Sequence, residues 1–164
     1  MKEGEVFTSS AGTLKCKRII HAVGPRWQGG NSNELENLHT CIVNCFNETA
    51  RHNISSVAIP PISTGVFFVP LKEAVETIVK SLYDRDTKGA YLPKLIYFVD
   101  TKDDSLELFK KELCRKYQGT QTTDDSIPLE TERYKLMSRP KPREPPPRKK
   151  RPPRPTRSSS FTSG

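Results

Sequence analysis

The feature that most constrains the fold is an alternation of short apolar segments with longer segments whose apolar residues recur every three or four positions. Four short segments have the pattern of β-strands, at residues 5–9, 17–23, 56–60 and 95–99. Three longer segments have helical spacing, at residues 33–52, 70–88 and 103–117. The order is strand, strand, helix, strand, helix, strand, helix. This order predicts an α/β fold with a largely parallel sheet covered by helices on both faces.

The charge of the chain is concentrated near its C-terminus. Residues 139–157 hold nine basic residues, one acidic residue and eight of the fourteen prolines, whereas residues 1–138 balance at zero charge. The net charge of +8 therefore belongs to this segment and does not predict a nucleic-acid-binding domain. Because proline at this density excludes helices and inner strands, we expect a disordered basic tail over residues 139–164. We expect a polar linker over residues 118–138 and a folded domain over residues 1–117.

Two segments of the tail fit patterns that SH3 domains bind. The residues are Arg139, Pro142 and Pro145 for R-x-x-P-x-x-P, and Pro152, Pro155 and Arg157 for P-x-x-P-x-R. The basic run at residues 148–151 has the composition of a nuclear-import signal or a weak nucleic-acid-binding patch. The alternative is that the tail is a solvated linker.

The cysteines and the apolar runs indicate a reducing compartment. Cys16, Cys41, Cys45 and Cys114 form no C-x-x-C pair, and no histidine is placed to complete a metal site with them. We therefore expect reduced side chains and no bound metal. No signal-peptide pattern occurs, and no apolar run approaches the ~20 residues of a membrane helix. The expected location is the nucleus or the cytoplasm, without membrane association.

The segment at residues 60–70 has the strongest indications of ligand binding. It joins the C-terminal end of an apolar strand to the start of a helix, where ligands of open α/β sheets bind. Its small residues Ser63, Thr64 and Gly65 would let the backbone approach a phosphate, and the helix N-terminus adds N–H donors. Phe67 would pack against a sugar. The alternative is an ordinary turn without a ligand.

Three motifs resemble those of the macrodomains, a family that binds ADP-ribose. Residues 4–14 are similar to the family's G-x-[AV]-x-x-T-x-[AS]-G-x-L strand, and residues 19–25 to its I-I-H-x-V-G-P segment. Residues 62–70 are similar to its I-S-[TS]-G-[IV]-[FY]-x-x-P loop. The resemblance runs from about residue 4 to residue 113, and residues 96–100 look most like the macrodomains of large mono-ADP-ribosyltransferases. It implies a three-layer α/β/α fold with a mostly parallel mixed sheet.

The resemblance also implies roles for individual residues. The diphosphate of ADP-ribose would be wrapped by the backbone of Ser63, Thr64, Gly65, Val66 and Phe67. Phe67 would also line the distal ribose. Val99 and Asp100, at the end of the last strand, would border the adenine.

The sequence also departs from the family. The family's domain begins with two strands and a helix that carry an acidic residue reading the adenine, an N-A-A-N segment and a glycine-rich loop. The sequence contains none of these, so we expect a domain truncated at its N-terminus with half of its pocket, no catalytic residues and no enzymatic activity. The strand at residues 95–99 would have an uncovered edge. Phe68 stands where many relatives have glycine and would crowd the ribose, and we interpret His21 as a core histidine.

Three functions follow in order of preference. The first is recognition of ADP-ribose or of mono-ADP-ribosylated proteins, with an NAD-derived ligand and no cofactor. The second is an interaction protein that acts through its tail on SH3-type partners. The third is an ADP-ribosyl hydrolase or a fragment of an ADP-ribosyltransferase.

Overall fold

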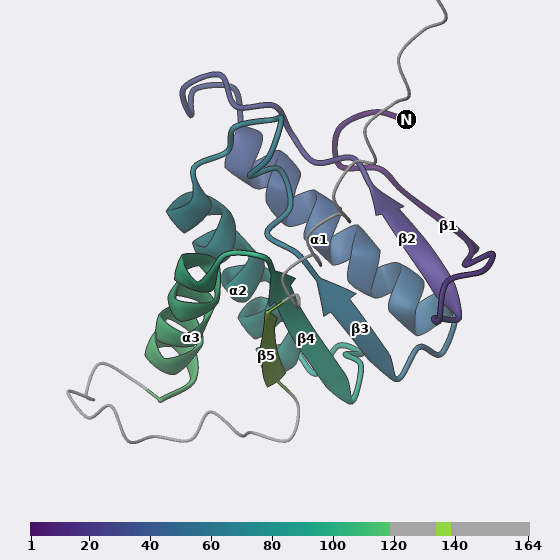
Figure 1. Cartoon of the computed structure of the whole chain (residues 1–164). Coiled ribbons are helices and arrows are strands. Elements are labelled where there is room, and N and C mark those ends of the chain that lie inside the picture. Colours follow the sequence, from purple (N-terminus) through teal and green to yellow (C-terminus); the bar gives the residue numbers. More distant parts are fainter. Residues whose placement is uncertain (119–133, 139–164) are drawn as a thin grey trace, which may run out of the picture.

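The structure, a computed structural model, describes residues 1–118 and 134–138 (Figure 1). The SH3-type motifs and the basic run of the tail lie outside these residues. The elements are β1 (Val6–Ser10), β2 (Arg18–Ala22), α1 (Glu34–Arg51), β3 (Ser56–Ile59), α2 (Leu71–Thr87), β4 (Leu95–Asp100), α3 (Asp103–Gln118) and β5 (Tyr134–Ser138). The predicted order of the first seven elements is confirmed.

The strands form two sheets. β1 pairs with β2 in antiparallel fashion, from Val6 opposite Ala22 to Ser10 opposite Arg18. β3, β4 and β5 form the second sheet, and both of its pairs are parallel. The predicted α/β fold with mixed and mostly parallel pairing is confirmed.

β5 was not predicted, because it lies in the segment that we expected to be a polar linker. It pairs with β4 from Ile96 opposite Tyr134 to Asp100 opposite Ser138. The expectation that β4 has an uncovered edge is therefore wrong. A five-residue strand that joins the sheet after a long connection leaves almost no local pattern in the sequence.

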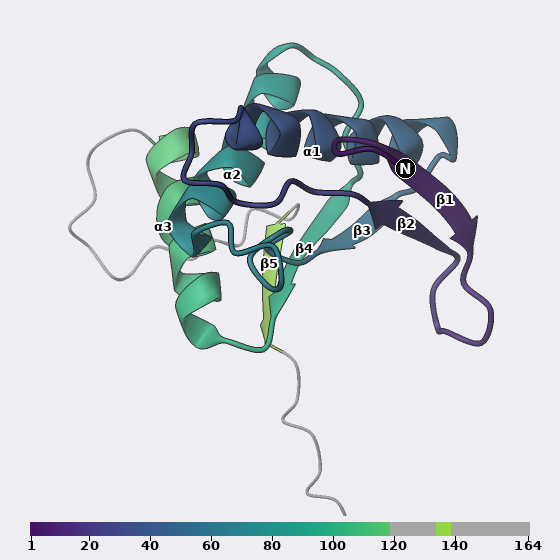
Figure 2. The same cartoon turned by 90° about the horizontal axis from the view of Figure 1, so that it is seen from above.

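One hydrophobic core joins the helices to the strands. It combines the apolar stripes of α1, α2 and α3 with Ile59 of β3 and with Ile96 and Phe98 of β4. The rings of Phe98 and Phe109 stack with centroids 4.4 Å apart. Figure 2 shows α1 and α2 lying over the strands. Loops project from the ends of these strands.

The outer face of β3 is open. Ser56 and Ala58 are exposed, whereas Val57 and Ile59, which alternate with them, point toward the helices. Of the three layers expected, the described residues form the strand layer and one layer of helices.

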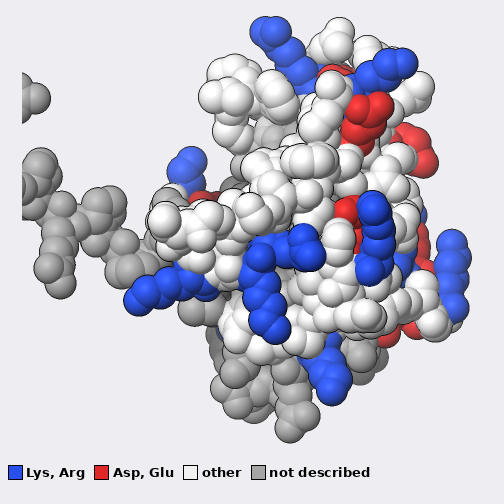
Figure 3. Space-filling model, turned by 90° about the vertical axis from the view of Figure 1, so that its right-hand side faces the viewer, with Lys and Arg blue, Asp and Glu red and all other residues white. Residues whose placement is uncertain are grey.

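Charges are mixed on the surface of the domain. On the face that carries β1 and β2, basic and acidic side chains are scattered among uncharged ones (Figure 3). This fits the balanced charge of residues 1–138. Within the described ranges, no helix is long and apolar enough to cross a membrane.

Candidate functional site

The loop at residues 60–70 lies at the edge of the sheet where parallel strands end. β3 ends at Ile59, which pairs with Phe98, and the chain then enters the loop that leads into α2. Val99 and Asp100 follow Phe98 at the end of β4. The topology therefore brings the predicted diphosphate loop and the predicted adenine border to the same edge of the sheet (Figure 1).

Internal hydrogen bonds fix the shape of the loop. The Val69 N–H donates to the Ser63 carbonyl oxygen at 3.0 Å, and the Phe68 N–H donates to the Gly65 carbonyl oxygen at 3.1 Å. The Thr64 hydroxyl donates to the Pro61 carbonyl oxygen at 2.8 Å. These bonds close the base of the loop and leave its tip, residues 65–68, exposed to solvent.

The tip carries free hydrogen-bond donors. No acceptor among residues 1–118 and 134–138 receives the backbone N–H groups of Gly65, Val66 and Phe67. Successive unpaired N–H groups in a fixed loop form a concave site that suits an anion. No described atom lies within 4 Å of a Cβ built on Gly65, so the approach to the loop is open there.

Gly24 lets the loop pack against the end of β2. A Cβ at Gly24 would clash with the side chains of Ser63 and Ile62, so the glycine allows this close packing. Ser63 has a left-handed backbone with φ 68°, and its buried hydroxyl has no partner among the described residues. The predicted I-I-H-x-V-G-P and I-S-[TS]-G segments are therefore in contact.

A second loop, residues 23–33, supports the first. The Trp27 N–H donates to the Phe67 carbonyl oxygen at 2.8 Å, and the Trp27 ring packs against the core. Glu34, which is 2% exposed, accepts backbone N–H bonds from Gln28, Gly30 and Ser32. The buried carboxylate thereby holds the second loop in one shape.

The same bonds set the charge state of Glu34. Burial favours the protonated form, but backbone N–H donors of Glu34 itself, Gln28, Ser32 and Gly30 outweigh it and lower the pKa of the carboxyl group below 4.5. Glu34 is therefore ionised at neutral pH. Asn33, the residue before α1, has φ 57° and makes no side-chain cap bond to the helix.

Asp100 is occupied by its own turn. Its carboxylate accepts from the Thr101 N–H at 2.5 Å, just before α3 begins. Burial tends to raise its pKa, but the nearby Ser105 hydroxyl and the Thr101 and Lys102 N–H groups lower it overall. The assignment of Val99 and Asp100 to the adenine border stays a prediction.

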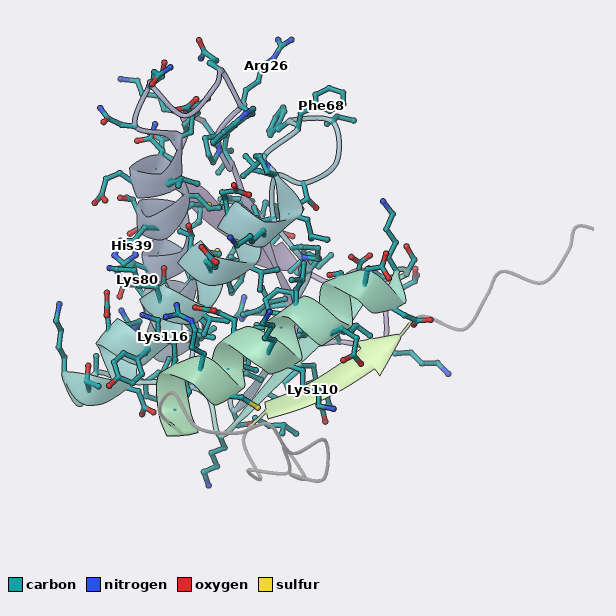
Figure 4. The ribbon with its side chains drawn as sticks, turned by 90° about the vertical axis from the view of Figure 1, so that its left-hand side faces the viewer. Arg26, His39, Phe68, Lys80, Lys110 and Lys116 are labelled. Atoms are coloured by element: carbon teal, nitrogen blue, oxygen red, sulfur yellow. The ribbon has the colours of Figure 1, made fainter. Side chains whose placement is uncertain are left out.

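Phe68 and Arg26 lie at the same end of the molecule, beside the bond between Trp27 and Phe67 (Figure 4). The Phe68 side chain projects outward from the loop and is 72% exposed. Arg26 is also exposed, and no described side chain forms an ion pair with its guanidinium. This end of the molecule therefore combines free N–H donors with a free positive charge.

His21 does not belong to the core. It is exposed on β2, its Nε2 lies 2.8 Å from Ser9 Oγ, and its ring stacks on Phe7 with centroids 6.0 Å apart. The interpretation of His21 as a core histidine is wrong, because its position in the strand alternates with the inward-facing Ile20 and Ala22.

A hollow lies between β2 and β3 and ends beneath the loop at Pro60 and Ile62. Its walls are almost entirely apolar. Together with the contacts of Trp27, Arg26 and Glu34, it belongs to the features of this region that the sequence did not reveal. Gly24 was recognised as part of the I-I-H-x-V-G-P motif but not as a contact of the loop, and nothing in the sequence distinguished Glu34 from the surface acids.

Comparison with known proteins identifies the family. Residues 1–78 match the family described as Macro domain. An O-acetyl-ADP-ribose deacetylase of Citrobacter rodentium (strain ICC168) is 36% identical over 118 residues, which are 72% of this chain and 65% of that protein. The chain thus spans less than two thirds of the length of this relative.

Solved macrodomains have the same fold. A substituted Oceanobacillus iheyensis macrodomain with ADPR is 26% identical at a TM-score of 0.63, over 69% of this chain and 60% of that one. The macrodomain of the same organism with ADP is 27% identical at the same TM-score, over 68% of this chain and 58% of that one. The further likeness to macrodomains of mono-ADP-ribosyltransferases stays a prediction.

The comparisons correct one expectation. We expected a binding module without enzymatic activity, but curated relatives that are 34–36% identical are named O-acetyl-ADP-ribose deacetylase, which is an enzyme. The inference failed because it treated segments missing from the resemblance as proof of missing chemistry. The family model, the matched motifs and the fold together show that residues 1–78 belong to a macrodomain.

Proposed function

We propose that the loop at residues 60–70 binds the diphosphate of ADP-ribose through its backbone. The observation that carries this proposal is the row of unpaired N–H groups on Gly65, Val66 and Phe67, held at the sheet edge where parallel strands end. Diphosphate oxygens are strong acceptors, and hydrogen bonds to a charged acceptor are about twice as strong as neutral ones. Arg26 adds a positive charge at the same end.

The ligand class is ADP-ribose, either free or attached to a protein. Two structural relatives were solved with ADPR and with ADP, and both ligands contain a diphosphate. The exposed tip of the loop leaves the far side of the ligand open to solvent. A protein that carries ADP-ribose would therefore have room to approach.

We further propose that the protein hydrolyses O-acetyl-ADP-ribose, as the names of the curated relatives indicate for them. In this reaction water adds to the acetyl carbonyl, the ester C–O bond breaks, and acetate and ADP-ribose leave. Fixed N–H donors that hold the diphosphate would position the ester. This part of the proposal is supported by the relatives, and the binding part is supported by the loop.

Substitution of Gly65 tests both parts. Gly65→Glu places a carboxylate beside the diphosphate, and we expect it to weaken ADP-ribose binding at least about a hundredfold, or about 2.7 kcal/mol. Gly65→Ala is the matched control, because a Cβ at this position meets no atom within 4 Å and should leave binding near the wild-type value. Calorimetric titration measures binding, and acetate release from O-acetyl-ADP-ribose measures activity.

The outcomes separate the two parts. Equal binding by all three proteins would show that the loop is not the ligand site. Normal binding of ADP-ribose without acetate release above a blank would contradict the hydrolase and leave the binding site standing.

A further inference from the structure

We propose that Phe68 and Arg26 form a docking surface for the protein segment that carries ADP-ribose. This surface selects segments with apolar and acidic residues beside the modified position. The inference rests on the proposed binding of ADP-ribose by the loop at residues 60–70. It adds a class of protein substrate, which contacts with the nucleotide alone do not define.

One hydrogen bond holds the two residues of the docking surface near each other. The Trp27 N–H donates to the Phe67 carbonyl oxygen at 2.8 Å. Arg26 is the residue before Trp27. Phe68 is the residue after Phe67, so each member of the surface is one residue away from this bond. Both side chains extend from the same end of the molecule (Figure 4).

Phe68 has an aromatic ring at a position where the protein alone gains little from it. Its φ of 57° is unfavourable for a phenylalanine, and its ring is largely exposed, so burial does not compensate. Residues held in such conformations concentrate at binding sites, where contact with a ligand explains them. An apolar group of a partner that covers the ring would supply the missing burial.

The ring lies outside the contacts proposed for the diphosphate. The Phe68 N–H is used within the loop, because it donates to the Gly65 carbonyl oxygen at 3.1 Å. The N–H groups that we assign to the diphosphate are those of residues 65–67. The Phe68 side chain projects outward from the loop (Figure 4). Its partner is therefore the group attached to ADP-ribose and not the diphosphate.

Arg26 determines the charge that this partner should have. Its guanidinium forms no ion pair with a side chain in the described ranges. Glu3 accepts the backbone N–H of Arg26 at 3.2 Å, so one acid already lies close by. A single carboxylate of a peptide matches one free guanidinium. A nucleic acid would bring a row of phosphates beside Glu3, and its binding needs several cations.

A mono-ADP-ribosylated peptide tests the docking surface. In this probe ADP-ribose is joined to the amide nitrogen of a central glutamine, a bond that ester hydrolysis does not break, with leucine and glutamate on both sides. The full chain should bind it at least about tenfold more tightly than free ADP-ribose, because burial of the ring and the ion pair add to the nucleotide contacts. A peptide with serine for leucine and lysine for glutamate is the control and should bind no more tightly than free ADP-ribose. Calorimetric titration measures all three.

Two substitutions assign the gain to the docking surface. Phe68→Asn removes the ring but keeps a residue that tolerates a left-handed backbone. It should bind free ADP-ribose like the wild type and lose most of the tenfold gain. Arg26→Ala should lower the preference for the glutamate peptide over the lysine peptide at least about threefold. Arg18→Ala removes the same charge at the exposed start of β2 and should keep the preference.

The results separate this inference from the proposed function. No binding of free ADP-ribose by the wild type would overturn both. Normal binding of free ADP-ribose, with the glutamate peptide bound no more tightly, would overturn the docking surface and leave the nucleotide site standing. The same holds for a gain that survives Phe68→Asn, for a preference that survives Arg26→Ala, and for equally tight binding of a single-stranded DNA that carries ADP-ribose at its end.

Discussion

At the scale of single residues, the loop at residues 60–70 contains two backbone conformations that its side chains do not favour. Ser63 and Phe68 have φ values of 68° and 57°, in the left-handed region that suits glycine. Hydrogen bonds at the base of the loop and the contact with Gly24 impose the conformation of Ser63. Phe68 is 72% exposed, so little burial compensates for its conformation.

Phe68→Gly should therefore stabilise the protein. A left-handed backbone costs a residue other than glycine roughly 1–2 kcal/mol, and the added freedom of glycine in the unfolded chain cancels part of that gain. We expect the free energy of unfolding in urea to rise by about 0.5–1 kcal/mol. Val66→Gly, at an equally exposed position without positive φ, is the control and should lower it. The account of Phe68 fails if both variants change stability in the same direction.

At the scale of elements, the loop before α1 is held by the charge of Glu34 and not by a side-chain cap from Asn33. The Glu34 carboxylate accepts hydrogen bonds from three backbone N–H groups of this loop. The backbone N–H of Trp27, in the same loop, donates a hydrogen bond to the Phe67 carbonyl oxygen. The stability that Glu34 contributes should depend on pH. Because its pKa is lowered in the folded state, the contribution is complete above about pH 4.5 and is lost as the pH falls through the folded-state pKa.

Glu34→Gln should lower the Tm by several degrees at pH 7, because the neutral amide binds the three N–H groups less strongly. The difference from the wild type should shrink as the pH falls below 4.5. Glu36→Gln, in the same turn of α1 but exposed, is the control and should leave the Tm almost unchanged. Thermal melts at pH 7 and pH 3.5 measure both effects. A difference that stays the same at both pH values would contradict the role of the Glu34 charge.

Helices and inner strands could be predicted from the sequence, whereas partners distant in the chain could not. The apolar stripe of α3, with Leu106, Phe109 and Leu113, is buried as predicted, because burial of a helix face leaves a periodic pattern. β5 and the Glu34 bonds leave no such pattern. β5 depends on a partner strand, β4, that is distant in the chain. The Glu34 bonds span only two to six residues, but they depend on a loop conformation that has no periodic pattern.

At the scale of the whole molecule, sequence motifs predicted the family and the loop at residues 60–70 that follows β3 at the sheet edge. The rule that ligands bind at the C-terminal edge of parallel strands needs only the order of the elements. The separation of the two sheets depends on which strands pair, and single-sequence patterns do not determine pairing. The SH3-type motifs at residues 139–157 lie outside the described residues and stay a prediction.

The central claim is that the backbone of residues 63–67 binds the diphosphate, and amide resonances measure this most directly. Titration of ADP-ribose into the ¹⁵N-labelled chain should shift the amide signals of Gly65, Val66 and Phe67 more than those of α3. ADP, which shares the diphosphate, should shift the same signals, and adenosine, which lacks it, should leave them in place. Shifts of these amides by adenosine as large as those by ADP, or no shift with ADP-ribose, would contradict the account.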